Sequence, residues 1–312
     1  MFTLMLLLIP IIALEVMSLG TTTTGYPAKK FLAKVHDLEI ESRKKFRDLL
    51  DTVHDRSSEL DGQEESLEVP RFTPGEVRPM PIDDEDFVNG STETTLSIPI
   101  EDEKGYPIVV SESEALETNV ALRDTRAKGG ELAHRTYRQK LIAKKLADAA
   151  PQATNRLKFK DSVANVITDE DLLDVAAAMT NAHAPEDERY MVIGASMYKA
   201  VVKIPNFISR DKMGQAGEVL PSNVIGKIRS FEVIEVADDV MPLLNASTGA
   251  TGTTGKKCVI FYQKYALAYV RHAYKLLGPT LDVGSAKTKW NLWAKQDAKG
   301  QNTDWAFTLR EN

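Results

Sequence analysis

The sequence predicts an α+β fold, and three patterns lead to that prediction. Residues 184–240 have the pattern of one compact unit made of a strand, a helix, a turn and a hairpin. A basic segment after residue 130 has apolar residues at helical spacing, and the C-terminal segment alternates apolar and polar residues as strands do. The chain has 312 residues, 43% of them hydrophobic and 27% charged, so it can bury one large core or two modest ones.

The first 60 residues are predicted to form an N-terminal arm. Phe2–Leu14 is an apolar run as long as the hydrophobic region of a signal peptide, but no Lys or Arg precedes it and no small-residue cleavage site is evident before Gly20. Two readings stay open: an apolar arm that packs on a neighbouring molecule, or a natural start at Met17. Helical spacing of apolar residues predicts an amphipathic helix from Ala28 to about Leu60.

Residues 61–118 are predicted to form an acidic extended loop that contains a β-hairpin. Residues 51–118 hold 19 Asp or Glu and 4 Lys or Arg, a local charge of −15. Alternating apolar residues predict strands at Thr94–Ile100 and Tyr106–Val110, and we expect the segment between them to join these two strands as a half-exposed hairpin.

Residues 119–168 begin with a long basic helix. Residues 119–160 hold 11 Lys or Arg and 3 Asp or Glu, a local charge of +8. Apolar residues at helical spacing predict that the helix runs through Ala149 and ends before Pro151. Gly129 and Gly130 each lower helix propensity by about 1 kcal/mol, which predicts an interruption or a bend.

Residues 169–280 contain the compact unit. Thr168 and Asp171 are spaced as a capping pair for a helix, and Ser196 offers a hydroxyl to start another that ends before Pro205. Short apolar runs between turn residues predict strands at Tyr190–Ile193, Val224–Ile228, Phe231–Val236 and Cys258–Phe261. A stripe from Tyr262 to Leu277 has helical spacing and is expected to stop at Gly278 and Pro279.

Residues 281–312 are predicted to be closing strands, because apolar residues around Trp290 and again from Trp305 to Leu309 alternate with period two. Before them, a Gly- and Thr-rich loop that ends in Gly255 and Lys256 resembles the end of a phosphate-binding loop. It fails that motif, because Ala250 and Lys257 occupy the places of the required Gly and hydroxyl residue.

Composition and motifs do not predict catalysis, a metal site or a cofactor. The net charge of −6 and the pI near 5.5 argue against a protein that grips phosphate backbones. The single cysteine, Cys258, excludes an internal disulfide and favours a reducing compartment, and its apolar neighbours predict a buried thiol. The five histidines are scattered, and acidic residues occur in runs and not as an isolated pair.

The compact unit resembles a signature of tailed-phage major capsid proteins with the HK97-type fold. Three stretches carry the resemblance: RYMVI after Pro185, SMYKAVVK from Ser196, and NVIGKIRSFEVIEV from Asn223, with a DKMG turn between the second and third. The match extends over about Asp169–Val240 and covers the flanks in layout only. Ser230 departs from the pattern, which often has Gly before the Phe.

This resemblance implies the architecture and the role. It implies an N-terminal arm (1–60), an extended hairpin loop (61–118), a spine helix with a peripheral domain (119–168), an axial domain (169–280) and closing strands that return to the peripheral domain (281–312). It implies a major capsid protein that self-assembles in the host cytoplasm into pentamers and hexamers of the icosahedral shell of the virion. Portal, scaffold or decoration proteins would be its partners; packaged DNA would be enclosed without sequence-specific binding, and no membrane is involved.

The opposite local charges predict that an acidic hairpin of one subunit meets the basic helix of another. The candidate inter-subunit contacts are Asp84, Glu85, Glu101, Asp102, Arg135, Arg138 and Lys144. Gly129 and Gly130 are the candidate helix bend, which we expect to change as the shell matures. Two alternatives remain open: an encapsulin-like nanocompartment shell, and an unrelated acidic enzyme or secreted binding protein.

Overall fold

The structure is a computed structural model of the whole chain. It describes residues 48–60, 64–73, 92–111, 122–150, 154–161, 166–204, 208–209, 224–282, 284 and 287–312. The apolar N-terminal segment and most of the predicted N-terminal helix lie outside the described residues, as do Asp84 and Glu85.

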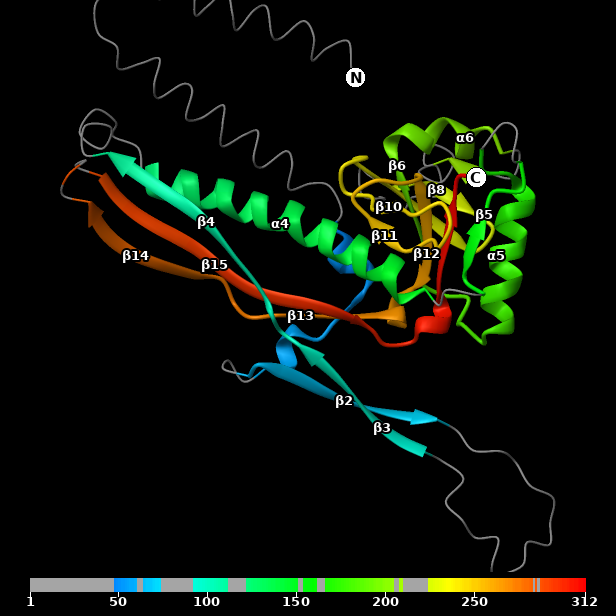
Figure 1. Cartoon of the computed structure of the whole chain (residues 1–312), viewed down its shortest axis with the longest axis horizontal. Helices are drawn as coiled ribbons and strands as arrows, with labels where there is room; N and C mark the ends of the chain where they lie inside the picture. The colour runs from blue at the N-terminus through cyan, green and yellow to red at the C-terminus, as the bar shows by residue number, and fades with distance from the viewer. Residues whose placement is uncertain are drawn as a thin grey trace, which may run out of the picture.

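A seven-stranded sheet forms the centre of a compact body (Figure 1). Its strands, in spatial order, are β5 (Arg156–Lys158), β16 (Ala306–Arg310), β12 (Cys258–Gln263), β6 (Arg189–Gly194), β9 (Phe231–Val236), β8 (Val224–Ile228) and β7 (Ile208–Ser209). β6 pairs in parallel with β9 and antiparallel with β12. The strands predicted from the apolar runs are therefore confirmed at their central residues.

The central strands β6 and β12 are buried on both faces, which explains why they are nearly continuous apolar runs in the sequence. Val192 and Ile260 lie in the core under helix α4 (Leu122–Ala149), whereas Met191 and Phe261 lie in the core that includes helix α5 (Asp169–Asn181). The capping box of α5 is confirmed: the Thr168 hydroxyl accepts from the Asp171 amide at 3.3 Å, and the Asp171 carboxylate accepts from the Thr168 amide at 2.8 Å.

The hydroxyl of Ser196 does not start the next helix, contrary to the prediction. Residues Ala195–Met197 form a short 3₁₀ turn (η4), and α6 (Tyr198–Val202) begins after it without a side-chain cap. The Ser196 hydroxyl instead accepts a hydrogen bond from Lys257 Nζ at 2.9 Å.

A second, elongated sheet extends from the compact body beneath α4 (Figure 1). Its strands are β1 (His54–Asp55), β13 (Leu267–Arg271), β15 (Lys287–Gly300), β14 (Lys275–Asp282) and β4 (Asp102–Ser111). β15 is its longest strand and pairs with β4 on one side and with β13 and β14 on the other. The closing segment thus divides between the sheets, since β15 belongs to this one and β16 to the seven-stranded sheet.

The helix predicted from Tyr262 to Leu277 is wrong. This stretch holds the end of β12, the 3₁₀ turn η5 (Lys264–Ala266), β13 and the start of β14. Residues Leu267–Val270 are all fully buried because β13 is covered on both faces. An apolar run buried on both faces has no period-two signal, so its spacing could not distinguish a strand from a helix.

The predicted hairpin between Thr94–Ile100 and Tyr106–Val110 is also wrong, although both strands exist. β3 (Thr92–Pro99) pairs antiparallel with β2 (Ser66–Thr73), and β4 pairs with β15. Only Ile100 and Glu101 separate β3 from β4, and neither has the positive φ that a two-residue hairpin loop requires. The chain therefore passes straight from one sheet to the other, and the β2–β3 hairpin projects from the body (Figure 1).

The end of the predicted N-terminal helix is not helical either. After the 3₁₀ turn η1 (Leu49–Thr52), Val53 is extended and β1 pairs in parallel with β13, followed by the 3₁₀ turn η2 (Ser57–Glu59). Leu49 and Val53 are buried under α4, so tertiary packing overrides the helical spacing. Shorter elements complete the described chain: β10 (Leu243–Leu244), β11 (Thr251–Gly252) and the 3₁₀ turn η6 (Thr303–Trp305).

Helix α4 is continuous through Gly129 and Gly130, so the predicted interruption is absent from this structure. The two glycines differ in their surroundings. A Cβ at Gly130 would lie 2.8 Å from Tyr106 Cδ1 and 3.0 Å from Leu292 Cδ2, whereas a Cβ at Gly129 would have nothing within 4 Å. Gly130 therefore allows α4 to approach β4 and β15 closely.

Candidate interaction surfaces

The β2–β3 hairpin is attached to the elongated sheet through its base. Ile98 and Ile100 are buried with Ala268 and Val270 of β13, and Lys299 Nζ donates to the Ser97 carbonyl at 2.8 Å. The strands beyond the base carry exposed side chains such as Glu68, Pro70 and Arg71. Because an isolated two-stranded hairpin is only marginally stable in water, this projecting segment is suited to contact with another molecule.

Arg135 and Arg138, two of the predicted contact residues, are engaged within the chain. The buried Arg138 guanidinium donates to the Asp48 carboxylate and, at 3.2 Å, to the Tyr274 hydroxyl; Arg135 Nε lies 3.4 Å from the same carboxylate. Burial alone would lower the pKa of Arg138, but the charge and hydrogen bond of Asp48 outweigh it and raise that pKa. This cluster fastens the start of the described chain to α4.

The remaining predicted contact residues have different surroundings. The Asp102 carboxylate accepts from the Tyr137 hydroxyl at 2.7 Å and lies 3.0 Å from Lys104 Nζ. Burial, together with this bond to Asp102, raises the pKa of Tyr137. Glu101 and Lys144 are exposed, and within the described residues Lys144 has no carboxylate partner.

Lys144 lines an open pocket of about 430 Å³ between α4 and the β10–β11 ribbon. Val240, Met241 and Pro242 supply apolar lining, and Lys140, which also lines the pocket, pairs with Asp239 at 2.8 Å. Among the described residues this pocket combines an ammonium group that has no carboxylate partner with apolar lining, so it suits an acidic segment that also carries apolar residues.

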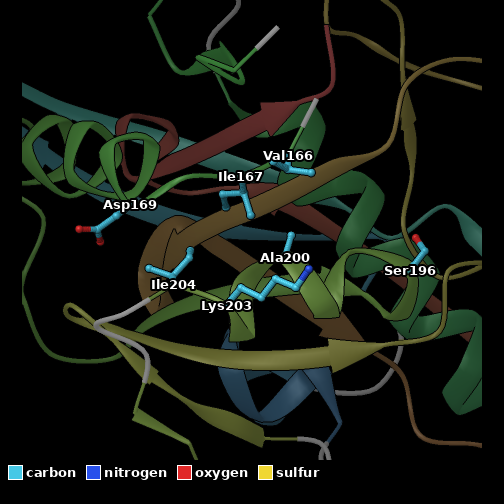
Figure 2. Close-up of a pocket in the computed structure, with 7 residues that line it drawn as sticks. All are labelled: Val166, Ile167, Asp169, Ser196, Ala200, Lys203 and Ile204. Atoms are coloured by element: carbon cyan, nitrogen blue, oxygen red, sulfur yellow. The ribbon is translucent and has the colours of Figure 1, made fainter. Parts of the chain in front are cut away.

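A second pocket, of about 460 Å³, lies between the start of α5 and α6. Figure 2 shows Val166 and Ile167 on one side of it and Ala200, Lys203 and Ile204 on the other. The Asp169 carboxylate at its edge is already paired with Arg229 at 2.7 Å. The described lining thus lacks the convergent polar groups that fix a small molecule.

The described residues contain no group of three or more His, Cys, Asp or Glu that could hold a metal ion. Burial raises the pKa of the Cys258 thiol to about 12, so this thiol stays protonated and unreactive in the folded protein. His134 and His272 bond to the carbonyls of Leu292 and Glu64, at 2.9 and 3.0 Å, which are structural roles. In the part of the chain that the structure describes, no helix is long and apolar enough to span a membrane.

No protein-family model and no curated protein matches the sequence. Solved structures do match. The structure of Mycobacterium phage Che8 is 15% identical, with a TM-score of 0.60 over 85% of this chain and 91% of that chain. The capsid of Cyanophage P-SCSP1u is 18% identical, with a TM-score of 0.59 over 85% of this chain and 88% of that chain. The chain has an HK97-type capsid fold.

The structure has a helix and a hairpin within the segments for which the resemblance implies a spine helix and an extended loop. α4 stands where the spine helix was expected, and the β2–β3 hairpin lies within the segment expected to form the extended loop. A holo encapsulin complex from Synechococcus elongatus shares the fold, at 12% identity and a TM-score of 0.52 over 84% of this chain and 86% of that chain.

Sequence reasoning missed two features of this capsid fold. Asp48 carries no local signal of its role, because its partners lie far away on α4. Leu276 and Leu277 of β14 were assigned to a helix, although Gly278 and Pro279, which follow them, were a usable sign of an irregular edge strand.

Proposed function

We propose that this chain is a major capsid protein, copies of which assemble into the closed icosahedral shell of a tailed-phage-like particle. The single observation that carries the proposal is the likeness to phage structures over 85% of this chain and about nine-tenths of theirs. Surfaces for contact between copies are supplied by the projecting β2–β3 hairpin and by the pocket at Lys144, which has no carboxylate partner among the described residues. The role is structural and not enzymatic.

The second candidate function is an encapsulin-like compartment. It is supported by the likeness to the encapsulin complex from Synechococcus elongatus. The phage structures have higher TM-scores, of 0.60 and 0.59, and this difference favours the capsid.

The proposed capsid role includes pentamers and hexamers as building units, assembly in the host cytoplasm, and residence in the virion. Portal, scaffold or decoration proteins would complete the particle. The acidic net charge of −6 suits a wall that encloses DNA without adhering to it.

Electron microscopy of the purified protein tests the proposal. The expected result is closed shells, and it should be sought with protein that begins at Met1 and with protein that begins at Met17. Particles from the native source should then protect DNA from nuclease. Protein cargo in place of DNA would favour the encapsulin, and a protein that remains monomeric in both forms at high concentration would contradict both candidates.

A further inference from the structure

Three exposed leucines lie together on a strand at the free edge of the elongated sheet. Leu276, Leu277 and Leu281 of β14 are 43%, 47% and 56% exposed. The other large apolar side chains that the described residues expose are scattered, on α5, α6, η5 and a loop. β14 pairs with β15 on one side, and no described strand pairs with its other side. It lies at the outer margin of the elongated sheet (Figure 1). Such a cluster marks a contact surface.

An irregularity in β14 places two of these leucines on one face of the sheet. Leu276 lies opposite Leu292, and Leu281 lies opposite Thr288, with a register shift between residues 277 and 280. Leu292 and Thr288 are four residues apart on β15 and so share a face. Residues 276 and 281 are five apart, so without the extra residue of the bulge they would lie on opposite faces.

We infer that β14 meets β14 of a second copy in an antiparallel arrangement about a twofold axis near Gly278 and Pro279. In that arrangement Leu276 of each copy lies beside Leu281 of the other, on the same face. Lys275 of one copy lies opposite Asp282 of the other, and Leu277 lies opposite Thr280. The strand is therefore complementary to itself in apolar character and in charge, as a twofold contact requires.

The centre of the strand disfavours a continuous backbone ladder between the two copies. Pro279 has no N–H to donate, and Gly278 has a φ of +116°, where its added Cβ would lie 2.8 Å from the Lys289 carbonyl oxygen. Edge strands protected in this way do not extend into long ladders. The leucine side chains flanking the centre, and not a continuous backbone ladder, then provide most of the contact.

A second copy is the occupant that the observations favour. The compact body of the same chain lies at the other end of the elongated sheet (Figure 1), so it does not cover this edge. A closed shell also needs contacts between copies besides those of the projecting hairpin. This step of the inference, and no other, rests on the proposed function. A twofold contact at this edge of the elongated sheet would link one ring of subunits to the next.

Disulfide trapping tests the inference directly. The variant carrying Leu276→Cys and Leu281→Cys should form a covalent dimer when shells are treated with copper–phenanthroline, because directly opposed residues of an antiparallel pair have Cβ atoms about 4.5–5.5 Å apart. Each copy supplies one cysteine to each of the two bonds, so crosslinking stops at the dimer. Native Cys258 is 1% exposed and does not interfere.

The single-cysteine variants are the matched controls and should give little dimer. A ladder of higher multimers would contradict a twofold contact, and absence of crosslinking in well-formed shells would contradict the contact itself while leaving the capsid role intact. Failure of the wild-type protein to form particles would instead contradict the proposed function.

Charge and apolar variants provide a second measurement. Lys275→Glu or Asp282→Lys alone should reduce shell yield, and the two changes together should restore it. Leu281→Asn should reduce the yield as well, whereas Leu173→Asn on α5, a leucine that is 44% exposed, should not. Equal yields for Leu281→Asn and Leu173→Asn, with unchanged melting temperatures, would overturn the inference.

Discussion

Asp48 shows how one residue ties a chain segment to the fold. Its carboxylate accepts a hydrogen bond from Arg138 and forms an ion pair with Arg135, both on α4. Arg138 also donates to the hydroxyl of Tyr274, which directly precedes β14. The Nε of Arg138 is buried without a hydrogen-bond partner in the described structure, so the guanidinium depends on Asp48 for most of its compensation. A buried charge that loses its only counter-charge is far more costly than a pair removed together.

We therefore predict that Asp48→Asn destabilises the subunit by about 3 kcal/mol or more, because it leaves Arg138 buried without a counter-charge. Arg138→Met in the same chain should recover part of the loss. Denaturant unfolding of the single and double variants measures both effects. The raised pKa of Arg138 means that its contribution is complete below the ordinary pKa of an arginine and is lost only above it, so the result should not vary near neutral pH.

A loss below about 0.5 kcal/mol for Asp48→Asn would show that solvent screens the pair. The same measurement bears on the predicted assembly contacts. If Asp48→Asn is strongly destabilising, reversal of Arg138 would damage the fold before it damaged any contact between subunits. Charge-reversal experiments on assembly should therefore leave Arg138 and Arg135 unchanged.

Single elements differ in how far their sequence determines them. The capping box at Thr168 is decided within four residues, and the runs that became β6, β8 and β9 are bounded by turn residues, so local patterns sufficed. Which strand another strand pairs with depends on residues far away in the sequence. β3 and β4 had the alternation of strands, but only the three-dimensional fold assigns them to β2 and β15.

The same limit applies to the candidate surfaces. The charge contrast between the acidic segment and the basic helix is visible in the sequence. It does not reveal that Arg138 is committed to Asp48 while Lys144 is exposed, because burial depends on residues far apart in the chain. The leucines of β14 were visible as residues, but their exposure follows from the position of the strand at the edge.

Within α4, the two glycines should respond oppositely to alanine. Gly129→Ala should stabilise the subunit by about 0.5–1 kcal/mol, because helix propensity improves and the added Cβ meets nothing within 4 Å. Gly130→Ala should destabilise it by about 1–3 kcal/mol, because the added Cβ meets Tyr106 and Leu292. Thermal unfolding of the two single variants measures the difference.

These variants also separate packing from the predicted bend. Gly129→Ala stiffens the helix without a clash, so a bend that forms during assembly should become rarer, and immature particles should fail to form or should expand early. Particle diameters before and after maturation provide the readout. Diameters equal to those of the wild type at both stages would show that α4 does not bend at this site.

At the scale of the whole molecule, the fold separates the two charged regions of one chain. The β2–β3 hairpin projects away from the body (Figure 1). Lys144 belongs to α4 and lines the pocket beside the β10–β11 ribbon. The sequence between β2 and β3 includes Asp84 and Glu85 with Ile82 and Phe87 beside them, so it combines acidic and apolar residues. The pocket at Lys144 combines an ammonium group with apolar residues and so has the complementary charge. Contact between copies would satisfy both surfaces.

We predict that Lys144→Glu lowers shell yield strongly while changing the free energy of unfolding by less than about 0.5 kcal/mol, because the side chain is exposed and unpaired within the described residues. One exposed ion pair contributes only about 0.2–1 kcal/mol, but a closed shell repeats it in every subunit. Asp84→Lys with Glu85→Lys should restore assembly of the Lys144→Glu protein, and the dependence on Lys144 should weaken as salt is raised. Lys158→Glu, on an exposed lysine of the same basic segment but on β5, is the matched control and should assemble normally. Equal loss of shells for both lysine variants, without rescue by the acidic partners, would mean that net charge and not this contact controls assembly.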